Sequence, residues 1–314
     1  MDEILAYFDS LGLDSELTQK TPVNKGHMSY EKAIYTNDSE RIFVKKFVED
    51  ANLNPTQSAH AVAYLQKENT VINQLSTIDT VPEHAELIDG SLVLPAYTEE
   101  LGWFWEAPED EELRPKYIKE ILNALFQKES VSVNLDESVV APSQQTLERK
   151  GWQKLIKTPG LKPQVADKLK QHKTNLYPMT IASGQELLNN LDNLMAKFKP
   201  IDATELTAFC HHDARQHNIA WHPFLGVRIV DWSWAGIGLP NSDSTMFLID
   251  LTKSEIDISQ YLDEYFNPKH AYTLIGYWLA RAIEPPNKSN PEVRLHQLAS
   301  AITAYNLLRL RETV

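Results

Sequence analysis

The sequence has few of the features that mark secreted, disulfide-rich or membrane proteins. It holds a single cysteine, Cys210, in 314 residues, so no disulfide can form within the chain, and a reducing compartment is expected. No apolar run approaches the roughly 20 residues that a membrane-spanning helix requires. The first residues, MDEIL, are acidic and lack the basic start of a signal peptide. These absences predict a soluble cytoplasmic protein without a membrane partner.

Basic residues are also in the minority. Lys and Arg number 30 against 43 Asp and Glu, which gives a formal net charge of -13. A surface of this sign repels nucleic acid unless it contains a basic patch, so no nucleic-acid partner is expected. It would attract a cationic small substrate, although solubility alone also explains an acidic surface. The hydrophobic share of 42% is ordinary for a globular protein, and the length is sufficient for two lobes.

The pattern of apolar residues predicts an α+β fold with two lobes. Strand-like runs at 30–35 and 41–48 precede a helix expected from Pro55 to Leu75, with Asn54 as its cap. Two short strands around the turn Asp89-Gly90 follow. After residue 97 the pattern becomes helical, with helices expected at 115–128, 164–173, 184–198, 256–266, 271–283 and 291–311. We therefore expect a small sheet lobe with one helix over 1–97 and a larger, mostly helical lobe over 98–314.

Charged side chains interrupt two apolar elements of the first lobe. Lys45 and Lys46 lie within a strand-like run, where alternation places them on opposite faces. Glu68 shares a helical face with Leu65 and Ile72, and a carboxylate buried there needs a partner. The strand lysine is the natural candidate. The alternatives are an edge strand whose lysines lie in water and a Glu68 that reaches solvent at the edge of the stripe.

The stretch 209–236 concentrates reactive side chains between strand-like runs. Asp213 and Asn218 are five residues apart, and Asp231 follows the apolar run Val227 to Val230. Carboxylate and amide oxygens are the hard ligands that Mg²⁺ prefers, together with substrate phosphates. A carboxylate beside them could accept a proton from an attacking hydroxyl, and Lys45 could hold phosphate oxygens. These are the components of phosphoryl transfer, which depends mainly on positioning and charge neutralisation.

The run from His211 to Asn218, followed by Val230-Asp231-Trp232, resembles the H-x-D-x-x-x-x-N and I-D-W motifs of the aminoglycoside phosphotransferase family. The resemblance implies a bilobal protein-kinase-like fold that uses ATP and Mg²⁺. It also implies a role for each matched residue: Asp213 as catalytic base, His211 as a brace of its loop, Asn218 and Asp231 as Mg²⁺ ligands, Lys45 as the phosphate lysine, Glu68 as its partner, Gly26 and Ser29 in the loop over the phosphates, and Ala96 and Tyr97 in the hinge beside adenine.

Arg215 lies two residues after Asp213, at the offset where serine/threonine protein kinases have a lysine. Its planar fork could stabilise charge on the transferred phosphoryl group. The alternative is an arginine that pairs with an acidic neighbour. The sequence departs from the family pattern at His212, where a glycine is usual, and in the phosphate-covering segment, which holds only Gly26. Gly238 and Asp243 fall near the family's G-x-P-x-x-D-L-A segment, but Asp243 lacks the Leu-Ala that normally follows.

We therefore predict an ATP-dependent phosphotransferase that moves the γ-phosphate to a hydroxyl of a small molecule, which could be aminoglycoside-, choline- or sugar-like. Two alternatives remain open. One is a non-catalytic, kinase-like module that binds nucleotide for regulation, which the single Gly26 favours. The other is a metal-dependent phosphohydrolase built on the His212-Asp213 pair, with His211, His217 and His222 as nitrogen ligands.

Overall fold

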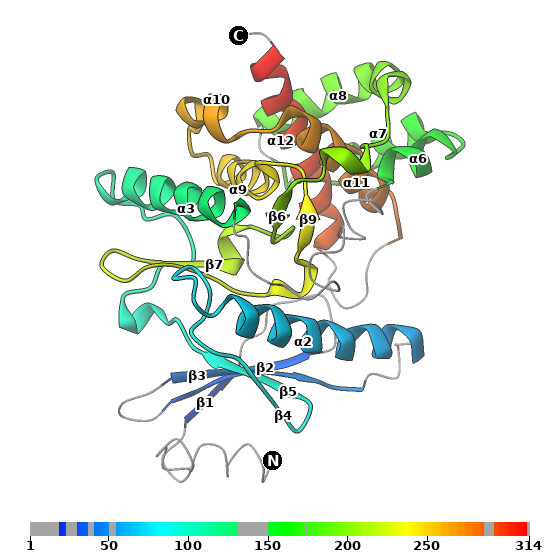
Figure 1. Ribbon diagram of the computed structural model, residues 1–314. Coiled ribbons are helices and arrows are strands. Elements are labelled where there is room, and N and C mark those ends of the chain that lie inside the picture. Colours follow the sequence, from blue (N-terminus) through cyan, green and yellow to red (C-terminus); the bar gives the residue numbers. More distant parts are fainter. Residues whose placement is uncertain are drawn as a thin grey trace. The chain divides into compact units, whose positions relative to one another are not determined.

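The computed structural model describes residues 19–22, 30–36, 41–49, 55–130, 150–173, 175–176, 178–285 and 292–312. The chain separates into two compact units, each assembled from segments that are distant in sequence (Figure 1). The first unit comprises Met1–Ala124, Ser132–Val139 and Gln216–Ala235. The second comprises Leu125–Val131, Val140–Arg215 and Gly236–Val314. The division into lobes after Tyr97 stays a prediction.

The first unit contains a five-stranded sheet in the order β1-β2-β3-β5-β4, in which all neighbouring strands are antiparallel. The strands are β1 (Gln19–Pro22), β2 (Tyr30–Thr36), β3 (Arg41–Phe47), β4 (Glu86–Ile88) and β5 (Ser91–Pro95). The predicted strands at 30–35 and 41–48 are confirmed, as is the hairpin around Asp89-Gly90. Asp89 and Gly90 both have positive φ angles, 46° and 68°, as a tight two-residue hairpin turn requires.

The helix α2 (Pro55–Leu75) is the predicted helix of the first unit, and it packs on β4 and β5. Its buried face carries Leu65, Ile72 and Leu75, each at most 2% exposed. Glu68 lies on the same face and is also buried. The periodicity of the sequence therefore assigned this carboxylate to the interior correctly. The proposed cap Asn54 lies outside the described residues.

A second hairpin in the first unit is formed by β7 (Ile219–His222) and β8 (Gly226–Ile229), with Ile219 opposite Ile229. It is preceded by the short helix η4 (Gln216–Asn218) and followed by η5 (Trp232–Trp234). The fully buried Trp221 anchors the hairpin, because its indole nitrogen donates to Glu120 at 2.6 Å. Glu120 belongs to α3 (Leu113–Glu129), close to the helix predicted at 115–128. The structure also describes η2 (Glu99–Leu101) in this unit.

The second unit is mostly helical. Its elements are α6 (Gly151–Ile156), α7 (Leu161–Gln171), α8 (Pro178–Lys197), η3 (Ala203–Glu205), β6 (Ala208–Cys210), β9 (Gly236–Gly238), α9 (Ser242–Lys253), η6 (Ser259–Tyr261), α10 (Leu262–Tyr265), α11 (Pro268–Ala282) and α12 (Val293–Glu312). The pair α11 and α12 packs together, and β6 pairs with β9. The helix α6 crosses α11 closely, since a Cβ on Gly276 would lie 2.5 Å from the ring of Trp152.

The helix predicted over 256–266 is wrong in length, because this segment holds only η6 and the four-residue α10. Asp257 accepts a hydrogen bond from the Ser259 backbone at 2.9 Å, which favours a turn instead of a continuous helix. A new helix then starts at Asn267, whose side chain accepts from the His270 backbone N–H.

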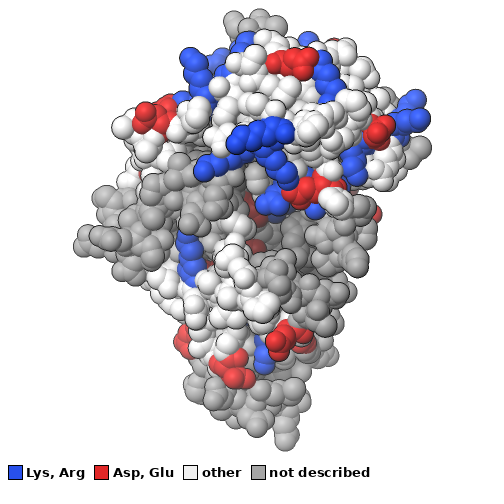
Figure 2. Space-filling model, turned by 90° about the vertical axis from the view of Figure 1, so that its right-hand side faces the viewer, with Lys and Arg blue, Asp and Glu red and all other residues white. Residues whose placement is uncertain are grey.

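The surface charge is not evenly distributed. Figure 2 shows lysine and arginine side chains gathered over the helices of the second unit, in the upper part of the view, although the net charge of the sequence is -13. Among the helices that the structure describes, none combines the length and the apolar character that a membrane crossing requires.

Candidate active site

Lys45 is the centre of a buried polar cluster in the first unit. Its ammonium nitrogen lies 3.0 Å from Glu68 Oε2 and 3.1 Å from Asp231 Oδ1, and 5.0 Å from the centre of the Tyr30 ring. The predicted ion pair between a strand lysine and Glu68 is therefore present. The neighbouring Lys46 points to the opposite face of β3, where its half-exposed side chain lies 3.7 Å from Asp89.

The electrostatics of this cluster keep Lys45 charged. Burial by itself would lower the pKa of Lys45, but the charges of Asp231 and Glu68 outweigh burial and hold that pKa above its usual value. Burial raises the pKa of Glu68, against the effect of Lys45. The ammonium group of Lys45 thus forms ion pairs with two carboxylates. The three residues of the cluster come from β3, α2 and the segment after β8.

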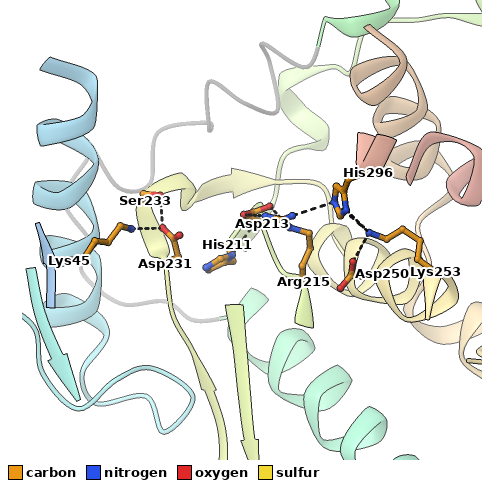
Figure 3. A network of polar contacts seen from close by, with 9 residues as sticks. All are labelled: Lys45, His211, Asp213, Arg215, Asp231, Ser233, Asp250, Lys253 and His296. Carbon is orange, nitrogen blue, oxygen red and sulfur yellow. Dashed lines mark hydrogen bonds and ion pairs between the residues drawn. The ribbon is translucent and has the colours of Figure 1, made fainter. Parts of the chain in front are cut away.

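Asp231 follows β8 and lies at the same end of its hairpin as Asn218, because the Val230 N–H donates to the Asn218 carbonyl at 2.9 Å. Asp231 has a φ of 63°, a left-handed conformation that costs a non-glycine residue about 1 kcal/mol or more. Ser233 Oγ donates to Asp231 Oδ1 at 3.0 Å, and Figure 3 shows this bond beside that of Lys45. The turn therefore aims the carboxylate at Lys45.

The segment that carries Asp231 is fastened to the helix that carries Glu68. Lys67 donates from its ammonium group to the Ala235 carbonyl at 2.6 Å. The rings of Tyr64 and Trp234 lie 4.9 Å apart. These contacts between α2 and η5 hold the two carboxylates on either side of Lys45.

The oxygen donors in this unit suit Mg²⁺. Asp231 and Asn218 supply a carboxylate and an amide oxygen from one end of a hairpin, and Asp231 keeps a side chain that is 32% exposed. Two protein ligands with phosphates and water completing the shell are typical of Mg²⁺ sites with nucleotides. The donor set fits this ion, although binding itself stays a prediction.

Two of the histidines that a His-Asp phosphohydrolase would use as nitrogen ligands have other contacts. His222 Nδ1 accepts from the backbones of Phe224 and Leu225, both at 3.1 Å, and so caps the hairpin turn. The half-exposed His217 lies 3.9 Å from Glu106. The residues that the structure describes contain no group of three or more His, Cys, Asp or Glu side chains that could hold a metal ion.

Ala96 and Tyr97, which are predicted to lie beside adenine, use part of their backbone within the fold. The Ala96 N–H donates to the Arg41 carbonyl at 3.0 Å, and the Tyr97 carbonyl accepts from the Trp105 indole at 2.8 Å. A nucleotide contact through these residues would therefore depend on their remaining backbone groups. The two other predicted nucleotide contacts, Gly26 and Ser29, lie outside the described residues.

Asp213 lies in the second unit, in the loop after β6, and its neighbours orient it. Its backbone N–H donates to His211 Nδ1 at 3.2 Å, and the bracing role of His211 stays a prediction. Both carboxylate oxygens are held by Arg215, from Nε at 2.9 Å and from Nη2 at 2.8 Å. The sequence left open whether Arg215 pairs with an acidic neighbour, and that neighbour is Asp213 itself.

A chain of polar contacts extends from Arg215 into α12 and α9, as Figure 3 shows. Arg215 Nη1 lies 3.4 Å from His296 Nε2, and Lys253 Nζ lies 3.5 Å from both ring nitrogens of His296. Lys253 pairs in turn with Asp250 at 2.7 Å. Burial lowers the pKa of Lys253, although Asp250 opposes this effect. Sequence reasoning missed His296, Lys253 and Asp250, because no local motif links α9 or α12 to the loop.

The buried Asp243, at the start of α9, fixes the backbone of the same loop. It accepts from the N–H groups of His211 at 2.6 Å and His212 at 2.8 Å, and it pairs with the buried Lys128. Burial would raise the pKa of Asp243, but Lys128 and the two histidines hold it well below its usual range. Sequence reasoning missed Lys128, although it lies three residues after the buried Leu125 on the apolar face of α3.

Residues 55–277 match the model of the phosphotransferase enzyme family, whose members include the aminoglycoside phosphotransferases. The chain belongs to this family. The match covers α2, the loop with Asp213 and the turn with Asp231. No curated protein matches the sequence at a significant level.

Solved structures of kinases and phosphotransferases share the fold of this phosphotransferase. Choline kinase LicA from Streptococcus pneumoniae is 14% identical, with 96% of this chain and 97% of that chain covered and a TM-score of 0.54. Spectinomycin phosphotransferase APH(9)-Ia, solved with ADP and spectinomycin, is 11% identical, with 100% and 98% covered and a TM-score of 0.52. A thermostable mutant of aminoglycoside phosphotransferase APH(4)-Ia is 11% identical, with 99% and 100% covered and a TM-score of 0.55. The predicted α+β, kinase-like fold is confirmed.

His212 shows how this phosphotransferase accommodates its departure from the family motif. Its φ is 66°, which explains why a glycine is usual at this position. Its buried ring fills the space beside β9, since a Cβ on Gly238 would lie 2.6 Å from the His212 ring and 2.9 Å from the sulfur of Cys210. The chain thus combines a large residue at 212 with a glycine at 238.

Proposed function

We propose that this phosphotransferase moves the γ-phosphate of ATP to a hydroxyl of a small molecule in a Mg²⁺-dependent reaction. The observation that supports the proposal most strongly is the contact of Lys45 with both Glu68 and Asp231. The Lys45–Glu68 pair is buried, which is costly, and the partly exposed Asp231 joins it from 186 residues away in sequence. Phosphoryl transfer would account for this arrangement. Lys45 would neutralise phosphate charge, Glu68 would hold Lys45 in place, and Asp231 would bind Mg²⁺.

In the proposed reaction Lys45 binds phosphate oxygens while Glu68 fixes its side chain. Asn218 and Asp231 hold Mg²⁺, which neutralises negative charge on the phosphates when it is bound. Phosphoryl transfer proceeds through a loose transition state with charge spread over the phosphoryl oxygens. The contribution of the first unit is therefore electrostatic and positional.

Asp213 takes the proton of the acceptor hydroxyl. The hydroxyl oxygen forms a bond to the γ-phosphorus, the bond from that phosphorus to the bridging oxygen of ADP breaks, and the proton passes to the Asp213 carboxylate. The bidentate contact with Arg215 defines the orientation of the Asp213 carboxylate. In a loose transition state, orientation matters more than basicity, so this arrangement is compatible with catalysis. In this proposal Arg215 also stabilises negative charge on the transferred phosphoryl group.

The fold does not restrict the acceptor to one chemical class of alcohol. The similar structures include a choline kinase and a phosphotransferase bound to spectinomycin, so choline-like, aminocyclitol-like and sugar-like alcohols are the first candidates. The acidic net charge of -13 favours a cationic acceptor. Arg215 and Lys253, which lie in the network of Asp213, work against a cation directly beside the base. A screen must therefore include cationic, neutral and anionic alcohols.

The test is an acceptor screen that measures ADP release with MgATP. Asp213→Asn and Asp231→Asn should each lower acceptor-dependent turnover by roughly 10² to 10⁴-fold, in the range of lost proton transfer and lost electrostatic stabilisation. Asp167→Asn, an exposed carboxylate on α7, is the matched control and should retain full turnover. Full activity of both active-site variants would refute the proposed roles. Binding of MgATP without hydrolysis or transfer to any acceptor would favour the regulatory alternative.

A further inference from the structure

Two lysines face each other across β2 and β3. The register pairs Lys32 with Lys45, and directly opposite residues of an antiparallel pair place their side chains on the same face. Lys45 is held by Glu68 and Asp231. The ammonium group of Lys32 has no hydrogen bond or ion pair to any residue in the described part of the chain.

This arrangement opposes the stability of the sheet. Like charges opposite each other on a sheet are destabilising, and Lys32 is partly buried besides. Burial lowers the pKa of Lys32 most and the charge of Lys45 lowers it further, while the charges of Asp231 and Glu68 oppose these effects without restoring the usual value. The next pair of the same two strands, on the other face, is Glu31 opposite Lys46, which have complementary charges. The sheet therefore carries its like-charge pair only on the face that holds the Lys45 cluster.

A polyphosphate is the ligand that would compensate for two adjacent ammonium groups. A fully ionised nucleoside triphosphate carries about four negative charges, more than the roughly three that one lysine and one Mg²⁺ neutralise. Kinase-like proteins supply further donors from backbone N–H groups of a glycine-rich loop. In this chain the seven residues between β1 and β2, VNKGHMS, include a single glycine. A lysine on β2 would add a charged donor beside a segment that has only one glycine to let the backbone approach the phosphates closely.

We propose that Lys32 is a second phosphate-binding residue of the nucleotide site, which contacts a phosphoryl oxygen of bound ADP or ATP beside Lys45. This inference rests on the proposed nucleotide binding and adds a residue to it. Lys32 supplies charge and contacts the phosphates; it takes no part in proton transfer. Its mutual repulsion with Lys45 persists in the free protein and is relieved when the phosphates bind.

Calorimetric titration of adenosine, ADP and ATP into the full chain tests the inference without an acceptor. Lys32→Gln should weaken ATP and ADP binding by roughly 10- to 100-fold, the range of one lost charge-assisted hydrogen bond. Adenosine binding should change less than twofold. Lys32→Arg should retain most of the affinity. Lys46→Gln on the opposite face is the matched control and should bind all three ligands as the unchanged protein does.

The thermal midpoint of the ligand-free protein separates this role from a purely structural one. Removal of a repelling charge should leave the midpoint of Lys32→Gln unchanged or higher, whereas loss of a structural contact would lower it. The inference is overturned if Lys32→Gln binds ATP within twofold of the unchanged protein, or if it loses adenosine and ATP affinity in equal proportion. If the unchanged protein binds neither ADP nor ATP, the proposed function is refuted, and the proposed role of Lys32 is refuted with it.

Discussion

Replacement of Lys45 by methionine should lower the free energy of unfolding, because Lys45 neutralises the buried carboxylate of Glu68. Glu68 is 1% exposed and would lose its ion pair, while Asp231 would remain nearby as a second negative charge. Removal of one partner of a buried ion pair typically costs about 3–5 kcal/mol. We expect a loss of this size in the free energy of unfolding at pH 8. Lys46→Met, one residue away but half-exposed, should change it by less than about 0.5 kcal/mol.

The destabilisation should depend on pH in a defined direction. Burial raises the pKa of Glu68 in the folded chain above its value in the unfolded chain, and removal of Lys45 strengthens this shift. The folded variant then binds more protons than the unfolded chain between the two pKa values, so its stability falls as pH rises through that window. Lys45→Met should therefore be less destabilised at pH 5 than at pH 8. The double variant Lys45→Met, Glu68→Gln should recover most of the loss and show little of this pH dependence.

Urea unfolding followed by tryptophan fluorescence is a suitable assay, because five of the seven tryptophans belong to the first unit. The four proteins needed are the unchanged chain, the single variants Lys45→Met and Glu68→Gln, and the double variant, which together form a mutant cycle. A coupling free energy near zero would refute the reasoning. So would a Lys45→Met variant that is as stable at pH 8 as Lys46→Met.

Three further predictions concern the loop of Asp213. Arg215→Ala should lower kcat by roughly tenfold or more and leave ATP affinity nearly unchanged, as measured by steady-state kinetics and nucleotide titration; equal turnover would contradict its placement. Lys128→Met leaves the buried Asp243 unpaired and should lower the free energy of unfolding by about 3–5 kcal/mol, with Lys116→Met as the exposed control on the same helix. Gly238→Ala should destabilise the protein by about 1–3 kcal/mol, because its Cβ meets the His212 ring at 2.6 Å. Adding His212→Gly should restore the loss in thermal melts, and a double variant no more stable than Gly238→Ala would show that the two positions are not coupled.

Local patterns in the sequence were sufficient where one element decided the outcome. The periodicity of α2 placed Glu68 in the interior, and the alternation of β3 separated Lys45 from Lys46. The hairpin turn at Asp89-Gly90 followed from residues that tolerate positive φ. The segment 256–266 shows the limit of such patterns, since its apolar spacing fits a helix but a hydrogen bond that the Asp257 side chain accepts from the Ser259 backbone favours a turn.

The sequence by itself determined the family motif, the fold class and the buried carboxylate that needs a cation, because these depend on residues close together along the chain. Apart from the predicted Lys45–Glu68 pair, tertiary structure decided which charges meet. It placed Asp231 on Lys45, Arg215 on Asp213 and Lys128 on Asp243. It also set Lys32 opposite Lys45, because strand register is fixed by pairing between chain segments and not by either segment alone. Charge pairs form only over a few ångströms, and folding brings residues that are far apart in the sequence within that distance.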